Sequence, residues 1–363
     1  MARVLIVDDS PVVRAVLKDW IAAEKDMEVA GEAKDGLEAF EMTRSLKPEI
    51  VLMDIMMPRM NGLEATEKIM AYCPTPVLIF SSVVNDREMN IVFEAISRGA
   101  LDVLAKPSEM NDPQNQTRRE LLKKVRILSK VPVIKHPLGK LKTRRQESAD
   151  AGQAAAGTKT RPGEFAILGI GASTGGPKAL SELLAPFPRN FPAPVVVVQH
   201  IADAFIEGLA RWLASLTRLA VKIPAQDELL KPGTVYLAPS NQHMLVRDSR
   251  IQLSDAGPVN NCRPAVDILF NSLAENYGAR TVAVLLTGMG ADGARGMKAI
   301  HEKGGRTVVQ DEASSVVFGM PGSAIEMGAV DEVIPLEKIP AEIFEAFGLT
   351  EKEGEDKWAK KKN

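Results

Sequence analysis

The feature that most constrains the fold is a regular alternation of short apolar runs with segments of helical periodicity. Apolar runs of strand length occupy residues 4–7, 51–53, 77–80 and 101–104, and a helical segment opens at Pro11. Strands that alternate with helices of this length are typical of a parallel sheet covered by helices on both faces. We therefore predict a doubly wound α/β domain over residues 1–128.

The same alternation returns in the second half of the chain, over residues 164–348. We predict central strands at 166–170, 195–198 and 281–286, helices at 205–216 and 264–276, and shorter strands at 235–237, 244–247 and 250–253. The last two strands are joined by a hairpin turn at Asp248 and Ser249. This pattern predicts a second doubly wound, mostly parallel α/β domain.

The two α/β segments are separated by a basic stretch that contains proline and then by a run of small polar residues. This composition predicts an interdomain linker over residues 129–163, and the highly charged residues 349–363 are interpreted as a tail. The linker's basic residues serve solubility in the simpler interpretation. Docking to an acidic partner or to a domain face is the alternative.

Composition excludes several classes of protein. The 363 residues carry 45 Lys and Arg against 47 Asp and Glu, a net charge of −2, and aromatic residues make up only 5%, so no nucleic-acid partner is expected. No apolar run reaches the roughly 18 residues of a membrane span, which predicts no direct membrane insertion. Cys73 and Cys262 cannot form a disulfide framework, and we expect a cytoplasmic protein.

Polar residues follow the predicted strands of the first domain. Asp8 and Asp9 follow the first strand, Asp54 follows residues 51–53, Ser81 follows residues 77–80, and Lys106 follows the last strand. The carboxyl ends of parallel strands meet at one edge of the sheet, so the three carboxylates form a hard oxygen site suited to Mg²⁺. An Asp at a single position could be only a turn or cap residue, but five positions in order favour a site for an incoming phosphoryl group.

On these residues, positions 1–120 resemble the receiver domain of two-component response regulators, which implies a flavodoxin-like fold. The resemblance implies that Asp54 is the phospho-acceptor and that Asp8, Asp9 and Asp54 hold Mg²⁺. It also implies that Ser81 and Lys106 are the receiver switch residues, with Ser81 as the switch hydroxyl and Lys106 in contact with the phosphate. A histidine kinase is implied as the phosphoryl source. Two positions depart from the common pattern: Asn61 stands before Gly62 where many receivers have Asp, and Val103 replaces an aromatic switch residue.

A glycine-rich loop at residues 169–177 follows the first strand of the second domain. Its spacing fits either a dinucleotide-binding loop or a nucleophile elbow that presents Ser173. A dinucleotide site requires an acidic residue after the next strand, whereas residues 195–198 are followed by Gln199 and His200. The imidazole beside a serine-bearing loop favours nucleophilic chemistry.

Asp292 follows the strand at 281–286 within another glycine-rich loop. By itself it is equally interpretable as the N-cap of the following helix. Ser173, His200 and Asp292 together follow three parallel strands, an arrangement suited to a nucleophile, a base and an orienting carboxylate. Their order along the chain, Ser-His-Asp, differs from the Ser-Asp-His order of the α/β-hydrolases.

Residues 164–347 resemble the catalytic domain of the chemotaxis protein-glutamate methylesterases, the CheB family. The matching segments lie at residues 170–176, 199–200, 237–241, 263–267 and 286–293. The resemblance implies that Ser173 is the nucleophile, His200 the general base and Asp292 the carboxylate that orients it, with the Met289 N–H at the oxyanion. Cys262 stands where the family often has His, and we expect it to be an inert, buried thiol without effect on the chemistry.

The implied function is hydrolysis of glutamate γ-methyl esters, and deamidation of glutamines, on methyl-accepting chemoreceptors. The implied esterase reaction needs no cofactor, and phosphorylation of Asp54 is expected to relieve an inhibition that the receiver domain exerts by covering the Ser173 edge. Two alternatives stay open: a phosphorylation-dependent binding module with a vestigial active site, and a nucleotide-binding reductase. The missing ribose-binding acid disfavours the reductase.

Overall fold

The computed structural model describes residues 1–82, 86–107, 116–133 and 163–349. The chain divides into two compact units, Met1–Ala156 and Gly157–Asn363, each of which is described by itself. Nearly all of the predicted linker and tail lies outside the described residues, so their predicted bounds stay predictions. In the described ranges, no helix has the length and apolar character needed to cross a bilayer.

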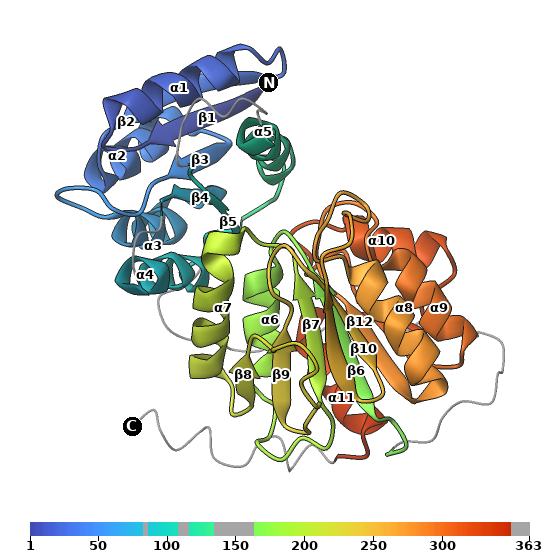
Figure 1. Ribbon diagram of the computed structural model, residues 1–363. Coiled ribbons are helices and arrows are strands. Elements are labelled where there is room, and N and C mark those ends of the chain that lie inside the picture. Colours follow the sequence, from blue (N-terminus) through green and yellow to red (C-terminus); the bar gives the residue numbers. More distant parts are fainter. Residues whose placement is uncertain (83–85, 108–115, 134–162, 350–363) are drawn as a thin grey trace. The chain divides into compact units, whose positions relative to one another are not determined.

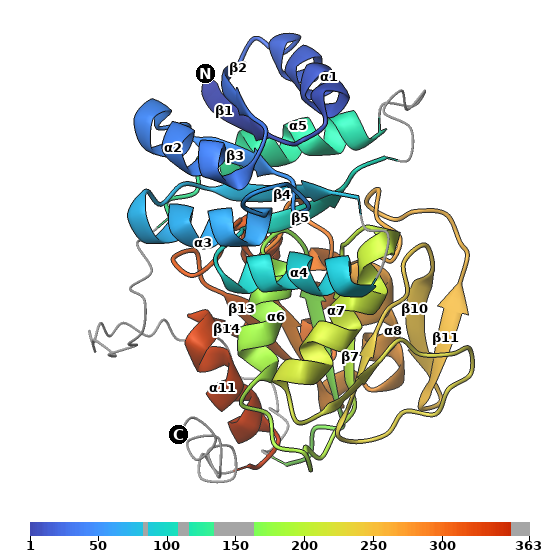
Figure 2. The same cartoon turned by 90° about the vertical axis from the view of Figure 1, so that its left-hand side faces the viewer.

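The N-terminal unit alternates strands and helices along its whole length. Its elements are β1 (Ala2–Val7), α1 (Pro11–Ala22), β2 (Met27–Ala33), α2 (Gly36–Leu46), β3 (Ile50–Met53), α3 (Gly62–Tyr72), β4 (Val77–Ser81), α4 (Asp86–Ser97), β5 (Asp102–Ala105) and α5 (Gln116–Leu128). The five strands are parallel and lie in the order β2-β1-β3-β4-β5, the flavodoxin-like order. The helices flank the sheet. On one side α2 packs against α3, and α3 packs against α4 (Figures 1 and 2).

Local sequence signals explain where several of these elements begin. Ser10 caps α1, because its hydroxyl accepts the N–H of Val13 and Pro11 follows as the first helical residue. Residues of β1, β3 and β4 are almost all buried, as expected for the central strands of a sheet covered on both faces. Strands β3 and β4 contain a single polar residue, Ser81, which ends β4.

The C-terminal unit contains a larger sheet with a separate hairpin. Its strands are β6 (Ile167–Ala172), β7 (Val195–Gln199), β8 (Ala220–Lys222), β9 (Thr234–Leu237), β10 (His243–Arg247), β11 (Arg250–Ser254), β12 (Thr281–Leu285), β13 (Arg306–Gln310) and β14 (Glu332–Ile334). Its helices are α6 (Gly176–Leu184), α7 (Asp203–Leu216), α8 (Val266–Asn276), α9 (Ala294–Glu302), α10 (Gly319–Glu326) and α11 (Ile339–Ala346), with short 3₁₀ turns at Gly278–Arg280 and Leu336–Lys338.

Seven strands form a parallel sheet in the order β14-β13-β12-β6-β7-β9-β8, and β10 pairs with β11 in an antiparallel hairpin. Helices α6 and α7 pack together on one side of the sheet, and α8 and α9 pack together on the other (Figures 1 and 2). Strands β12, β6 and β7 are neighbours at its centre. The loops after these three strands therefore meet at one edge.

The predicted α/β fold of both units is confirmed, and the predicted elements are present with ends that differ by at most two residues. The prediction omitted β2, β8, β13 and β14. Strand β2 has the sequence MEVAGEA and is mostly half-buried, and β14 is only three residues long. Edge strands like these lack the continuous apolar run that marks a central strand.

Candidate functional site

The acidic residues of the N-terminal unit come together at one edge of its sheet. Asp8 and Asp9 follow β1, and Asp54 follows β3, its immediate neighbour. One carboxylate oxygen from each of the three lies within 4.8 Å of the others. Asp8 and Asp54 are buried whereas Asp9 is exposed, so the cluster opens to solvent on one side. Three hard oxygen donors with an open side fit Mg²⁺, which keeps several of its own waters.

Lys106 and Ser81 complete this cluster, as predicted from the strand ends. The Lys106 ammonium lies 2.7 Å from Asp8 Oδ2 and 2.9 Å from Asp54 Oδ2, and Ser81 Oγ donates to Asp54 Oδ1 at 2.9 Å. Burial alone would lower the pKa of Lys106, but the two carboxylates raise it above its usual value. Lys106 is therefore a fixed positive charge beside Asp54.

The Asn61–Gly62 departure from the receiver pattern affects the turn before α3. Asn61 caps α3 through its side-chain oxygen, which accepts the N–H of Glu64 at 2.9 Å. Gly62 is required for close packing, since a Cβ there would lie 2.0 Å from the carbonyl oxygen of Asp54. The turn thus packs directly against the backbone of the candidate phospho-acceptor.

In the C-terminal unit, Ser173 lies in the loop between β6 and the N-terminus of α6. Its backbone is held from three directions: its N–H donates to Thr287 O, and its carbonyl accepts the N–H of Gly176 and the side-chain amide of Gln199. The Gln199 amide also donates to the carbonyl of His200. Gln199 therefore ties the serine loop to the histidine and occupies the strand end where a dinucleotide site would place an acid.

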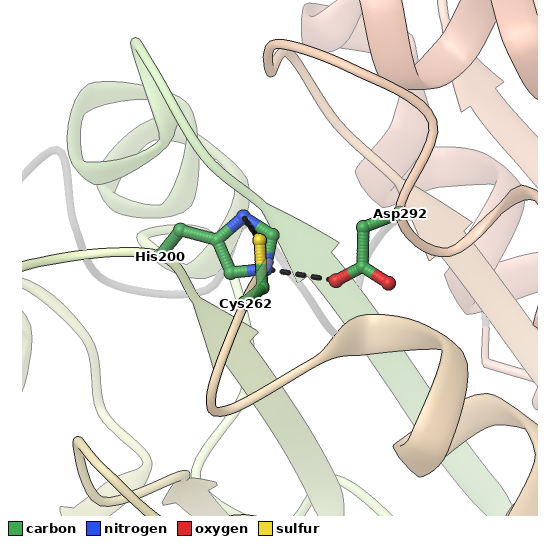
Figure 3. A group of neighbouring side chains, drawn as sticks. All are labelled: His200, Cys262 and Asp292. Atoms are coloured by element: carbon green, nitrogen blue, oxygen red, sulfur yellow. Dashed lines mark hydrogen bonds and ion pairs between the residues drawn. The ribbon is translucent and has the colours of Figure 1, made fainter. Parts of the chain in front are cut away.

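The side chains of His200 and Asp292 contact each other directly. Asp292 Oδ2 lies 2.9 Å from His200 Nε2 (Figure 3). An ionised carboxylate can only accept, so Nε2 carries the hydrogen and Nδ1 is left with a free lone pair when the ring is neutral. His200 follows β7 and Asp292 follows β12, and β6 with its serine loop lies between these strands.

Asp292 does not cap the helix that follows it, so the N-cap alternative is wrong. The N-cap residue of α9 is Gly293, without a side-chain bond. Asp292 instead accepts the N–H groups of Val266 and Asp267, at 2.7 and 3.2 Å, at the start of α8. The positive end of that helix favours the carboxylate. Asn260 donates to it as well, at 2.8 Å.

These contacts shift the pKa values of both partners. Burial would raise the pKa of Asp292, but the hydrogen bonds from His200, Asn260 and the α8 backbone lower it below its usual value. Burial would lower the pKa of His200, but the hydrogen bond to Asp292 and the contact with Cys262 raise it to about 9. The pair is therefore stabilised as imidazolium and carboxylate.

The expectation that the Cys262 thiol is buried is wrong, whereas its inertness stays a prediction. Its side chain is half-buried, and its Sγ lies 3.8 Å from His200 Nδ1 and 3.5 Å from the carbonyl of Asn260 (Figure 3). The reason is that the turn at residues 259–262, closed by paired Val259 and Cys262, brings the thiol to the histidine. No local pattern shows this long-range contact.

The predicted oxyanion donor lies in the loop after β12. Among the described residues, the Met289 N–H has no hydrogen-bond acceptor. Gly288 allows this loop to approach the serine, because a Cβ there would lie 2.7 Å from Ser173 Cβ. Within the same described ranges, no hydrogen bond joins Ser173 Oγ to His200. Such contacts are often long in an enzyme without substrate.

Sequence reasoning missed Asn260, which bridges Asp292 and Asp267 with one amide. Its signal is the Asn-Asn pair at 260–261, where both residues have positive φ, typical of a tight turn. It also missed Thr287, whose hydroxyl bonds the carbonyls of Thr174 and Val317 and so holds two loops together.

Comparison with known proteins decides the family. A family model described as CheB methylesterase matches residues 168–343, and one described as response regulator receiver domain matches residues 4–117. A protein-glutamate methylesterase/protein-glutamine glutaminase of Anaeromyxobacter dehalogenans is 45% identical over 94% of this chain and 96% of its own. The chain belongs to the CheB methylesterase family.

Two further relatives match this chain over different lengths. The methylesterase/glutaminase numbered 4 of Myxococcus xanthus is 42% identical, over 95% of this chain and 97% of its own. A crystal structure of the Thermotoga maritima CheB methylesterase catalytic domain is 43% identical and covers 50% of this chain and 98% of its own, with a TM-score of 0.48. The two matching family models confirm the predicted receiver and CheB catalytic domains.

Proposed function

We propose that this chain hydrolyses glutamate γ-methyl esters, and deamidates glutamines, on methyl-accepting chemoreceptors. The proposal combines membership of the CheB family with the arrangement of the loops after β12, β6 and β7. One observation carries it: Asp292 binds His200 Nε2 at 2.9 Å, so the lone pair of the neutral ring lies on Nδ1, at the sheet edge that also bears Ser173. This is the division of roles that a serine nucleophile and its base require.

In the proposed reaction, Ser173 Oγ attacks the ester carbonyl while His200 Nδ1 accepts its proton. Asp292 acts as a positioning residue that fixes the ring and stabilises the imidazolium formed in this step. The Met289 N–H donates to the developing oxyanion, a contribution of about 3 kcal/mol in chemistry of this type. Methanol leaves with the proton held by His200, and water then hydrolyses the acyl-enzyme.

Glutamine deamidation follows the same sequence, with ammonia as the leaving group instead of methanol. Each step uses a side chain or backbone N–H of the chain itself, so the proposed esterase reaction needs no cofactor. The free enzyme must have neutral His200 to begin either reaction.

The proposed regulation uses the N-terminal acidic cluster. Asp54 is the proposed phospho-acceptor, and a chemotaxis histidine kinase would supply the phosphoryl group. Asp8, Asp9 and Asp54 would hold Mg²⁺. The ion, when bound, neutralises charge on the phosphoryl oxygens. The contacts of Lys106 and Ser81 with Asp54 support their proposed role of binding phosphoryl oxygens after transfer.

Labelling with a serine-directed organophosphate tests the proposed nucleophile. Intact mass measurement should show one adduct on the wild type and none on Ser173→Ala, with His200→Ala labelled at least 100-fold more slowly. Ser240→Ala is the matched control, since Ser240 lies in the same unit outside the proposed reaction, and should label like the wild type. Labelling that persists in Ser173→Ala contradicts the assignment, and a wild type that is not labelled favours the binding-module alternative.

A further inference from the structure

Cys262 brings a third metal-binding side chain to the proposed active site. Ligand atoms of His200, Cys262 and Asp292 all lie within 4.8 Å of one another (Figure 3). The proposed esterase reaction uses the histidine and the carboxylate but gives the thiol no role. A thiol, an imidazole and a carboxylate are the side chains that bind Zn²⁺.

The spacing of the thiol and the imidazole fits a shared ion. Zinc binds sulfur at about 2.3 Å and histidine nitrogen at about 2.0–2.1 Å, so tetrahedral geometry separates the two ligand atoms by roughly 3.5 Å. The distance from Cys262 Sγ to His200 Nδ1 is 3.8 Å. A small side-chain adjustment places both atoms at bonding distance from one cation.

Asp292, the third side chain of the group, does not bind the ion in this arrangement. It takes the position of the carboxylate that accepts a hydrogen bond from a metal-bound histidine. Asp292 accepts the hydrogen of His200 Nε2, so the lone pair of the neutral ring lies on Nδ1, beside the thiol. A metal-bound histidine almost always donates its other N–H to such a carboxylate, which fixes the ring and makes it a better ligand. The backbone of α8 and Asn260 in turn hold Asp292.

We propose that Zn²⁺ binds between Cys262 Sγ and His200 Nδ1, with water in its remaining positions. On binding, the thiol loses its proton to solvent and the sulfur forms a bond to zinc, with no change of oxidation state. The ion occupies the lone pair that His200 uses as general base. Zinc is thus a reversible inhibitor of the esterase, a consequence that rests on the proposed function, whereas the binding itself does not.

The two candidate ion sites among the described residues differ in chemical preference. The cluster of Asp8, Asp9 and Asp54 offers only carboxylate oxygens, which suit Mg²⁺. The Cys262–His200 pair offers sulfur and nitrogen, which select zinc and related transition metals over Mg²⁺. Excess Mg²⁺ therefore fills the first site and leaves the second available.

Cobalt(II) tests the binding directly, because a cobalt–thiolate bond has a charge-transfer absorption in the near ultraviolet that oxygen ligands do not give. Full-length protein in excess Mg²⁺ and a phosphine reductant should develop this band on addition of Co²⁺, and Zn²⁺ should remove it. Cys262→Ser and Cys262→Ala should both lack the band. Cys73→Ser is the matched control and should retain it. A missing band in the wild type, or a band that persists in both Cys262 variants, overturns the proposal.

Inhibition by zinc is then measured as the rate of hydrolysis of receptor methyl esters. The rate of each enzyme with zinc is compared with the rate of the same enzyme without metal. Zinc should reduce the wild-type and Cys73→Ser rates at least tenfold, a chelator should restore them, and Cys262→Ser should require at least tenfold more zinc. A cobalt band without zinc inhibition overturns the inhibitory role. A wild type with the band and no esterase activity at any zinc concentration contradicts the proposed function while supporting the metal site.

Discussion

The two nitrogens of His200 face different partners, and this difference determines which of them can act as the base. Nε2 is bound to Asp292, and Nδ1 faces Cys262 and is the only ring nitrogen left for Ser173. The thiol and the serine hydroxyl therefore compete for one lone pair. At the scale of single residues, the account depends on Asp292 keeping this tautomer.

Asp292→Asn should lower kcat by about 10²–10⁴-fold with little change in KM. The Asp267 N–H and the Asn260 amide both donate to Oδ1, so the oxygen of the new side chain should occupy this position. Its NH₂ group then occupies the Oδ2 position, where it donates toward His200, favours hydrogen on Nδ1 and leaves the Val266 N–H without its acceptor. Steady-state methanol release measures this. Asp267→Asn is the matched control, because Asp267 has no contact with the His200 ring among its described hydrogen bonds, and it should lose less than tenfold. Equal losses in the two variants would count against the role of Asp292.

The pH dependence of kcat/KM should show a rising limb on the alkaline side. The pKa of His200 is raised to about 9 against burial, by Asp292 and by Cys262. Only the neutral ring can accept the serine proton, so activity rises as pH approaches that pKa. Cys262→Ser should shift the limb to lower pH because one contribution is removed. A kcat/KM that is flat from pH 6 to pH 9 contradicts this description of the base.

At the scale of elements, the sequence predicts which residues lie at the ends of strands. It does not predict the contacts between residues that are far apart in the chain. Continuous apolar sequences mark the buried strands β1 and β3 of the first sheet and β6, β7 and β12 of the second. Within each sheet, parallel pairing brings the carboxyl ends of these strands together. The placement of Asp8, Asp54, Ser173, His200 and Asp292 follows from that rule.

The contacts of Asp292 and Cys262 depended on tertiary packing instead. Asp292 binds the start of α8, which comes earlier in the chain, and local sequence suggested the helix that follows it. The turn that carries Cys262 contains no strand or helix period. Its approach to His200, 62 positions earlier in the chain, is invisible to local pattern.

The loop after β12 should tolerate no side chain at Gly288. Gly288→Ala places a Cβ 2.2 Å from Met320 Sδ and 2.7 Å from Ser173 Cβ, so we expect a loss of about 1–3 kcal/mol in the free energy of unfolding and at least tenfold lower activity. Gly322→Ala in α10 is the control: its nearest contact is 3.5 Å, and it should be neutral or stabilising by up to about 1 kcal/mol. Urea denaturation compares them, and equal stabilities would contradict the packing.

At the scale of the whole molecule, a receiver unit precedes an esterase unit in one chain. We predict that the unphosphorylated receiver restrains the esterase and that phosphorylation of Asp54 relieves the restraint. An activation of ten- to hundredfold requires a shift of only about 1.4–2.8 kcal/mol between resting and active states.

A variant lacking residues 1–150 should therefore be active without a phosphodonor. Its methanol release should match that of the phosphorylated full-length protein, and full-length Asp54→Asn should stay at the resting rate. Circular dichroism establishes that the shortened protein is folded. A folded truncated protein that works only at the resting rate would contradict restraint by the receiver.

The most direct test of the central claim is methanol release from methylated chemoreceptor membranes, with and without a small-molecule phosphodonor and Mg²⁺. We predict that the wild type releases methanol and that the phosphodonor increases the rate. Ser173→Ala should release none under either condition, and Asp54→Asn should lose the stimulation but keep the basal rate. Release by Ser173→Ala at the wild-type rate, or no release by a wild type whose Asp54 is demonstrably phosphorylated, would contradict the account.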